Sequence, residues 1–306
     1  MASWTAADIP DQRGRTVLVT GANSGLGLRT ATALAAKGAR VLLACRDQAK
    51  AVGALAQVES AGGEAEVVSV DLADLSSVRA CADDVRERVE RLDVVVNNAG
   101  VMALPERRTA DGFEMQFGTN HLGHFALTGL LLPTLLAAEA PRVVTMSSGA
   151  HKIGRMHWDD LMFERGYRRW LVYGQSKLAN LLFTFGLDRR ARQAGAPLIA
   201  VAAHPGYAST HLQAAGPEMA GRKLMAKVME VANQVVAQSD EMGALPSLYA
   251  ATMPDVQGSE YFGPDGPGEL RGHPRRVSAT KHAYDDAAWD RLWARSEELT
   301  GVTYAW

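Results

Sequence analysis

Short apolar segments alternate with helical patterns along the first two thirds of the chain, and this alternation constrains the fold more than any other feature. The apolar segments are continuous runs rich in Val, Leu and Ala, as expected for a parallel sheet covered on both faces. The alternation predicts an α/β fold built on an open, doubly wound parallel sheet. The expected strands are residues 16–20, 40–44, 65–70, 94–96, 142–146 and 198–203, and the expected helices are residues 26–37, 49–60, 75–90, 111–138, 171–193 and 285–299.

One domain is expected to account for the whole chain. The chain has 306 residues, and α/β chains of about 250 residues commonly fold as a single unit. Doubly wound sheets bind ligands beyond the carboxyl ends of their strands. We therefore expect a single domain over residues 1–306, with a cofactor-binding part over about 15–150, a catalytic and substrate part over about 151–263 and a C-terminal cap over about 264–306.

Composition excludes several classes of function. Lys and Arg number 32 against 34 Asp and Glu, so nucleic acid or an anionic membrane is not expected as the main partner. Two cysteines cannot form a disulfide framework, which suits a cytoplasmic protein. Residues 1–15 lack the apolar run of a signal peptide, and the apolar stretch 125–138 is short and contains Pro133. We expect no integral membrane anchor.

A glycine-rich turn follows the first expected strand and leads into a helix. It reads Thr20-Gly-Ala-Asn-Ser-Gly-Leu-Gly27, with the spacing Gly-x-x-x-Gly-x-Gly. Glycines at this point permit a tight turn, close approach of the backbone to a pyrophosphate and close packing of the helix on the strand. We therefore expect a dinucleotide cofactor to contact Gly21, Asn23, Ser24, Gly25, Leu26 and Gly27.

The turn and six further motifs resemble those of the short-chain dehydrogenase/reductase superfamily, in the same order along the chain. The resemblance covers about residues 15–261 and implies a Rossmann-like fold with a nicotinamide cofactor. The further motifs are Asp71-Leu72, Asn97-Asn98-Ala99-Gly100, Asn120, Ser147-Ser148, Tyr173-x-x-x-Lys177 and Pro205-Gly206 with Thr210. The resemblance assigns cofactor contacts to Asp71, Leu72, Asn98, Ala99, Gly100, Tyr173, Lys177, Pro205, Gly206 and Thr210.

The same resemblance implies a catalytic set of Asn120, Ser148, Tyr173 and Lys177. Hydride transfer to a carbonyl carbon leaves negative charge on oxygen, which needs a proton donor within hydrogen-bond reach. Tyr173 would be this acid or base, and Lys177, one helical turn further on, would lower its pKa. A lowering of ~3 units needs roughly 4 kcal/mol, which the lysine and the oxidised nicotinamide together could supply. Lys177 would also hold the ribose hydroxyls. Ser148 would hydrogen-bond the substrate oxygen, with Ser147 as the alternative, and Asn120 would hold a water that passes protons to Lys177.

The choice of cofactor depends on the end of the second expected strand. An acidic residue there binds the ribose 2′-hydroxyl of NAD, whereas an arginine pairs with the 2′-phosphate of NADP. Cys45 stands where NAD-dependent relatives carry Asp, and Arg46 follows it. We expect NADP(H). NAD(H) remains the alternative, with Asp47 reaching the ribose.

Within the superfamily, the chain most closely resembles retinol dehydrogenase-like members. The motifs are Ala44-Cys-Arg-Asp47, Thr119-Asn-His-Leu-Gly-His-Phe125, Ser147-Ser-Gly-Ala-His151 and Tyr173-Gly-Gln-Ser-Lys-Leu-Ala-Asn180. The long interval from Ser148 to Tyr173 carries Trp158, Phe163 and Trp170, which we expect to shape the substrate pocket. Retinol dehydrogenases usually have an N-terminal membrane anchor, which residues 1–15 do not resemble, so retinoid specificity is not carried over.

Residues 212–236 contain several methionines and valines among a few charges. Flexible methionine-rich surfaces adapt to irregular apolar ligands, so a substrate lid over a hydrophobic or bulky carbonyl or alcohol is one interpretation. A helix packed on the core and an amphipathic helix in contact with a membrane are the other two. The eight histidines show no metal-binding spacing, so no metal is expected.

Two functions from other classes stay open. One is a catalytically degenerate NAD(P)-binding redox sensor or regulator, and the other is an NAD-linked alcohol dehydrogenase. The oligomeric state is open as well. In the superfamily the helices that carry Asn120 and Tyr173 often form a dimer interface, but the retinol dehydrogenase-like branch also contains monomers.

Overall fold

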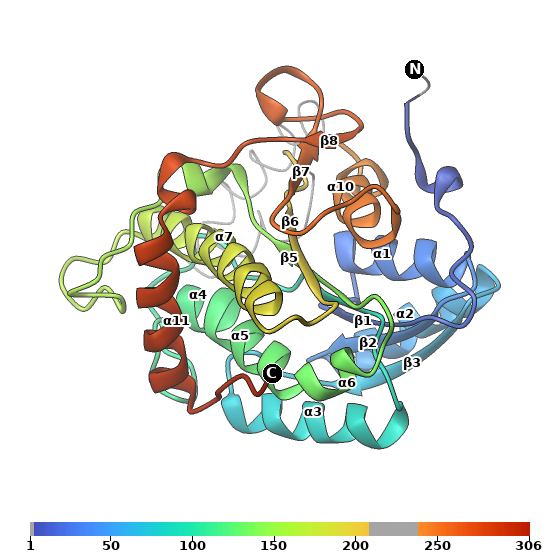
Figure 1. The fold of residues 1–306 in the computed structure, drawn as a ribbon, viewed down its shortest axis with the longest axis horizontal. Coiled ribbons are helices and arrows are strands. Elements are labelled where there is room, and N and C mark those ends of the chain that lie inside the picture. The colour runs from blue at the N-terminus through green and yellow to red at the C-terminus, as the bar shows by residue number, and fades with distance from the viewer. Residues whose placement is uncertain (1–2, 208–237) are drawn as a thin grey trace.

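The computed structural model describes residues 3–207 and 238–306, which form one α/β domain around an eight-stranded sheet (Figure 1). The strand order is β3-β2-β1-β4-β5-β6-β7-β8, and neighbouring strands are parallel except β7 and β8. The predicted doubly wound parallel sheet is therefore confirmed. The strands are β1 (Thr16–Thr20), β2 (Arg40–Cys45), β3 (Glu64–Ser69), β4 (Val94–Asn97), β5 (Arg142–Met146), β6 (Ile199–Ala203), β7 (Tyr261–Pro264) and β8 (Pro274–Arg276).

Helices cover both faces of the sheet. One face packs against α1 (Gly25–Ala35), α2 (Gln48–Ser60) and α10 (Asp240–Thr252). The other packs against α3 (Leu75–Arg88), α5 (Gly123–Leu130) and α7 (Arg169–Gln193). The C-terminal helix α11 (Asp286–Thr300) lies outside this second layer and packs on α7 and α5 (Figure 1).

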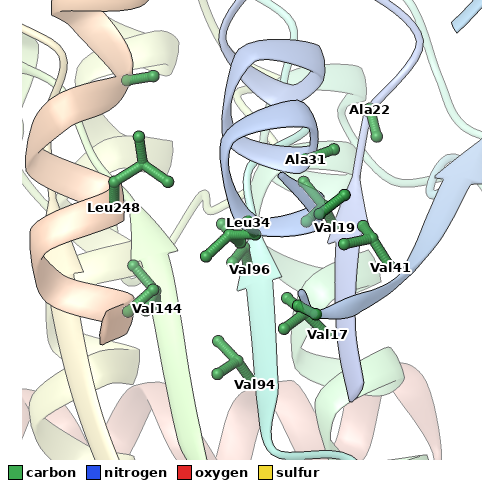
Figure 2. Packing of buried hydrophobic residues seen from close by; sticks show 14 of the residues in the cluster. Val17, Val19, Ala22, Ala31, Leu34, Val41, Val94, Val96, Val144 and Leu248 are labelled. Atoms are coloured by element: carbon green, nitrogen blue, oxygen red, sulfur yellow. The ribbon is translucent and has the colours of Figure 1, made fainter. Parts of the chain in front are cut away.

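The apolar strand residues divide between the two faces because successive side chains of a strand point to opposite sides. In β1, Val17 and Val19 join the core under α1 and α10, whereas Leu18 joins the core under α3 and α5. Figure 2 shows the first of these cores, where Leu34 of α1 and Leu248 of α10 lie against the valines of the sheet. Burial on both faces explains why the strands read as continuous apolar runs.

The single helix expected over residues 111–138 is wrong. The structure has α4 (Met115–Phe117), a π-helical turn (Gly118–Leu122), α5 and α6 (Leu132–Leu136) in its place. The break between α5 and α6 lies next to Pro133, which has no N–H to donate to a preceding turn. Single π turns inside helices occur mostly at functional sites, and Asn120 stands in this one.

Three elements were not expected from the sequence: α10, β7 and β8. Helix α10 contains Gly243 and Pro246, which weaken its helical pattern, and β7 ends at Gly263 and Pro264 inside a turn-rich segment. Thr210 and the segment 212–236 lie outside the described residues. Among the residues that are described, no helix has the length and apolar character needed to cross a membrane.

Candidate active site

The predicted site residues gather where the parallel strands end. The glycine turn follows β1, and the later motifs follow their strands in turn. The carboxyl ends of parallel strands meet at one edge of the sheet, so these motifs share that edge. Arg46 follows β2, Asp71 and Leu72 follow β3, Asn98, Ala99 and Gly100 follow β4, Ser148 follows β5, and Pro205 and Gly206 follow β6.

The glycine turn is shaped by backbone that only glycine permits. Gly21 has φ +67°, and a side chain at Gly27 would place its first carbon 2.3 Å from the carbonyl oxygen of Gly21. The turn is also tied to the motif after β4. Thr20 Oγ1 accepts hydrogen bonds from the backbone N–H groups of Asn98 (2.9 Å) and Ala99 (3.0 Å). The amide of Asn98 in turn donates to the Thr20 carbonyl oxygen at 2.8 Å. These hydrogen bonds therefore hold the glycine turn and the motif after β4 together.

Helix α1 starts directly after this turn, at Gly25. Within the described residues, its N-cap Ser24 makes no side-chain cap hydrogen bond. The first N–H groups of a helix have no partner inside the helix, and together with the helix dipole they favour an anion. The region around Asn23, Ser24, Gly25 and Leu26 thus suits a pyrophosphate. Cys45 faces the same turn, and burial raises the pKa of its thiol to about 11, so the thiol is neutral.

Arg46 is well placed to meet an anionic group. Its side chain is 72% exposed and forms an ion pair with Asp71 at 3.7 Å, so the ends of β2 and β3 are linked. Asp71 also accepts a hydrogen bond from the N–H of Ala73 at 2.9 Å. The alternative residue Asp47 caps α2 by accepting a hydrogen bond from the N–H of Lys50. This contact holds the pKa of the Asp47 carboxyl below its usual value and commits the carboxylate to the helix.

Ser148 lies near the phenol of Tyr173, close enough to lower its pKa. The ammonium of Lys177 lies 5.8 Å from the centre of the same tyrosine ring. Burial raises the pKa of Tyr173 to about 12, against a smaller lowering by Ser148. Burial also lowers the pKa of Lys177 to about 8. This direction applies to the protein alone, where desolvation outweighs the lowering by Ser148, whereas the lowering expected from the sequence was for the complex with the oxidised nicotinamide.

The two adjacent serines have different surroundings. Ser147 is buried and donates to the carbonyl oxygen of Lys177 at 2.9 Å, which fastens β5 to α7. Ser148 is half-buried and caps the short helix Gly149–Lys152 by accepting from the N–H of Ala150. Of the pair, Ser148 is therefore the one whose hydroxyl reaches Tyr173.

Asn120 uses its side chain to hold backbone. Its Oδ1 accepts from the N–H of Val101 at 2.7 Å, and its Nδ2 donates to the Val101 carbonyl and to Ser176 Oγ, both at 2.9 Å. Ser176 Oγ donates to the carbonyl oxygen of Tyr173 at 2.8 Å. Ser176 was missed in the sequence, although it stands inside the Tyr173-x-x-x-Lys177 motif. A water held by Asn120 could use the second lone pair of Oδ1, or the main-chain carbonyl, where His124 already occupies one of two acceptor positions.

Asn120 and Lys177 both lie next to Gly100, which has no side chain. A carbon added at Gly100 would lie 3.2 Å from Asn120 Oδ1 and 3.5 Å from Lys177 Nζ. Lys177 Nζ donates to the carbonyl oxygen of Met146 at 3.1 Å. His124 joins this group to the glycine turn, since its ring bonds both Thr20 Oγ1 (2.9 Å) and the Asn120 carbonyl (3.0 Å). Burial lowers the pKa of His124 to about 4, so the ring is neutral.

The three expected pocket aromatics are not gathered together. Trp170 is 46% exposed, and its ring lies edge-on to Tyr173 at 6.1 Å between centres. Phe163 packs on His157, and the ring of Trp158 is covered by the guanidinium of Arg291. Among the described residues, Trp170 is the one of the three in ring contact with the catalytic set.

Comparisons with known proteins identify the family of the chain. Residues 15–220 match the family model described as short chain dehydrogenase. Retinol dehydrogenase 14 of Mus musculus is 40% identical over 303 residues, covering 94% of this chain and 86% of that protein. The crystal structure of a putative uncharacterized protein from Mycobacterium paratuberculosis is 45% identical with a TM-score of 0.83, over all of both chains.

A more distant solved structure carries a cofactor. It is a putative NAD(P)-dependent gluconate 5-dehydrogenase from Beutenbergia cavernae with bound NADP. It is 26% identical with a TM-score of 0.60, covering 79% of this chain and 92% of that one. From the family model and the relatives together, the chain belongs to the short-chain dehydrogenase family and is an NAD(P)-dependent oxidoreductase that acts on CH–OH or C=O groups.

Proposed function

We propose that the chain uses NADP(H) to interconvert a carbonyl and an alcohol on a hydrophobic or bulky substrate, with Tyr173 as the acid or base. The observation that carries this proposal is the contact between Ser148 and the phenol of Tyr173, with the buried ammonium of Lys177 beside the same ring. A proton donor, a hydrogen-bonding hydroxyl and a cation at one point are what reduction of a carbonyl requires.

Each residue of the set has a defined task. When bound, the nicotinamide supplies or accepts the hydride. Tyr173 gives its proton to the substrate oxygen, and Ser148 holds that oxygen. Because burial raises the pKa of Tyr173 to about 12, the phenol is protonated near neutral pH, which is the form that reduction needs. Oxidation needs the phenolate instead, which the positive charge of the oxidised nicotinamide and of Lys177 would favour.

The remaining residues hold the set together and hold the cofactor. Asn120 and Ser176 fix the first turns of α7, and Lys177 and Tyr173 would also bind the ribose. The glycine turn fits the pyrophosphate, because Gly27 lets the helix start pack closely against Gly21 and the start of α1 lacks a side-chain cap among the described residues. The contacts proposed for the cofactor are those predicted from the sequence, at Gly21, Asn23–Gly27, Arg46, Asp71–Leu72, Asn98–Gly100, Pro205–Gly206 and Thr210.

NADP(H) is proposed over NAD(H) because of Arg46. Its exposed guanidinium stands at the end of β2, where a 2′-phosphate on the ribose would meet it. A planar guanidinium binds phosphate through two parallel hydrogen bonds, which a ribose hydroxyl cannot offer. The NADP in the related structure from Beutenbergia cavernae supports the same choice. Asp47, the residue that would favour NAD, is committed to α2.

A hydrophobic substrate is proposed because Trp170 offers an exposed aromatic ring beside Tyr173. The names of the relatives, retinol dehydrogenases, support an apolar alcohol or aldehyde. A cytoplasmic location is supported by Cys45 and Cys81, which are both buried and free of a disulfide.

Titration with NADPH and NADH, on the wild-type chain and on Arg46→Ala, tests the cofactor. We expect tighter binding of NADPH, weakened about tenfold in the variant as one charge-assisted contact is lost, with NADH binding unchanged. Hydrophobic aldehydes, ketones and alcohols are then screened for turnover. Tighter NADH binding that the variant leaves unaltered would redirect the proposal to NAD-linked alcohol oxidation. Tight NADPH binding without turnover of any compound would favour the redox sensor.

A further inference from the structure

A buried carboxamide joins three segments beside the catalytic set: the loop 101–104, the segment before α7 and the start of α7. We call these segments, together with Gln116, Asn120 and Ser176, the substrate side. Gln116 of α4 is fully buried. Its Oε1 accepts from the N–H of Ala103 at 2.7 Å, and its Nε2 donates to the Tyr167 hydroxyl and to the Arg169 carbonyl, each at 3.0 Å. Ala103 belongs to the loop that follows Gly100, Tyr167 ends the long interval before α7, and Arg169 is the first residue of α7. One side chain thus fixes all three.

The loop that Gln116 holds is strained. Ala103 is a buried residue with φ +50°, a strained conformation that residues other than glycine rarely adopt. Such a conformation persists only where its surroundings impose it. Two carboxamides impose it here: Gln116 binds Ala103, and Asn120 binds both backbone groups of Val101. The loop 101–103 is therefore held by two side chains four residues apart in the sequence.

Glu114 and Tyr167 complete this network. The buried carboxylate of Glu114 accepts from the N–H groups of Gln116 and Phe117, which caps α4. The Tyr167 hydroxyl lies 3.2 Å from Glu114 Oε1 and 3.0 Å from the carbonyl oxygen of Leu104, and it accepts from Gln116. Every polar atom of the network has a partner, so the removal of one member leaves a buried group unsatisfied.

We propose that Gln116 and Tyr167 are positioning residues for catalysis, which set the loop 101–104 and the Asn120 turn against the first turn of α7, where Tyr173 stands. This inference rests on the proposed function. Neither residue contacts the catalytic atoms. Both act by holding the backbone segments to which the catalytic side chains are attached. Their hydrogen bonds go to the substrate side of the site and to none of the residues of the glycine turn.

This placement predicts a specific kinetic pattern. A displacement of about 1 Å between reacting groups can cost about 100-fold in rate. Loss of the network should therefore reduce kcat while the dissociation constant for NADPH stays the same. A residue with a purely structural role would instead lower the melting temperature without moving kcat.

The test compares Tyr167→Phe and Gln116→Leu with Tyr249→Phe. Tyr249→Phe is the matched control, because it also removes a tyrosine hydroxyl. The Tyr249 hydroxyl donates to Asp255, which follows α10, away from the catalytic set. We measure NADPH binding by titration, kcat with the best aldehyde, and amide hydrogen exchange of residues 101–104 with NADPH bound. For both test variants we expect kcat to fall about 10- to 100-fold. We also expect faster exchange in 101–104, unchanged NADPH affinity, and no such changes in the control.

Two results would overturn the inference: kcat at the wild-type value in a folded Tyr167→Phe variant, or exchange in 101–104 that matches the control. Tyr167→Phe is the milder change, so it decides the matter if Gln116→Leu does not fold. If the wild-type chain turns over no compound, it is the proposed function that fails. The exchange comparison then still decides whether Gln116 and Tyr167 hold the loop.

Discussion

The two sides of the active site are built by opposite means. The cofactor side is shaped by side chains that are absent: Gly27 leaves room for the Gly21 carbonyl, and Gly100 leaves room for the Asn120 amide oxygen. The substrate side is held by buried polar side chains. Gln116 and Asn120 each hydrogen-bond both the loop 101–103 and α7.

This difference decides how each side should respond to substitution. A methyl group added at Gly27 forces the backbone of the turn to move, so the affinity for the cofactor should fall. Removing a polar atom from the substrate side loosens a loop, so turnover suffers while binding remains. The two effects are measured separately as the NADPH dissociation constant and kcat.

Tyr173→Phe should give the largest effect, mainly on turnover. The variant lacks the proton donor, and general acid catalysis by a placed group contributes about 10²- to 10⁴-fold, so kcat should drop about 10³-fold. NADPH binding should weaken less than about tenfold, as expected for one lost hydrogen bond. Rate and titration on the same preparation check this. Retention of a tenth or more of the turnover would break the assignment of Tyr173.

Gly27→Ala should give the next largest effect, on binding alone. The added carbon would lie 2.3 Å from the backbone oxygen of Gly21, so the turn must open. We expect NADPH affinity to fall about 100-fold, close to 3 kcal/mol. Gly53→Ala in α2 is the matched control, because nothing lies within 4 Å of the added carbon. NADPH affinity in Gly27→Ala equal to that of the control would show that the turn is not the binding site.

Lys177→Met should stabilise the fold while it removes activity. The folded pKa of about 8 lies below the usual 10.5, so the unfolded chain binds this proton more tightly. The resulting destabilisation is present in full below about pH 8 and disappears as the pH rises to about 10.5. The shift corresponds to at most about 3 kcal/mol, and the Met146 carbonyl keeps its bond from Asn180.

Thermal melts at pH 7 and pH 10 check the lysine prediction. The variant should melt at a higher temperature than the wild type at pH 7, and the difference should shrink at pH 10. Lys50→Met, an exposed lysine paired with Asp47, should change the melting temperature little at either pH. A lower melting temperature for Lys177→Met at pH 7 would contradict the cost of burying the ammonium.

Ser176→Ala should give the smallest effect, on the substrate side. Ser176 Oγ links Asn120 to the Tyr173 carbonyl, and Asn120 keeps its bonds to Val101 when the hydroxyl is removed. We expect a loss of about 1 kcal/mol in stability, and a few-fold loss in kcat without a change in NADPH affinity. An equal weakening of NADPH binding would show that the two sides are not separable.

The same contrast explains what the sequence could predict. The bounds of β1 and β5 were predicted to the residue, because a strand buried on both faces leaves an uninterrupted apolar run. The glycine turn has a local signature that reflects its backbone. The helix over 111–138 was predicted as one element because the apolar pattern shows neither the π turn at Gly118–Leu122 nor the exact break between α5 and α6.

The substrate side has no such signature. Gln116, Tyr167 and Ser176 look like ordinary polar residues in the sequence, and their importance follows from partners far along the chain. Gln116 and Arg169, for example, are 53 residues apart. The raised pKa of Tyr173 in the protein alone was not foreseen for a related reason, since the spacing to Lys177 is visible in the sequence and the burial of the phenol is not.

The most direct test of the proposed function is a single-turnover reaction of the wild-type chain preloaded with NADPH and mixed with a panel of hydrophobic aldehydes and ketones. We predict rapid loss of NADPH absorbance with at least one of them, matched by formation of the alcohol. Tight NADPH binding with no loss of absorbance for any member of the panel would contradict the account and identify the chain as a binder that does not catalyse carbonyl reduction.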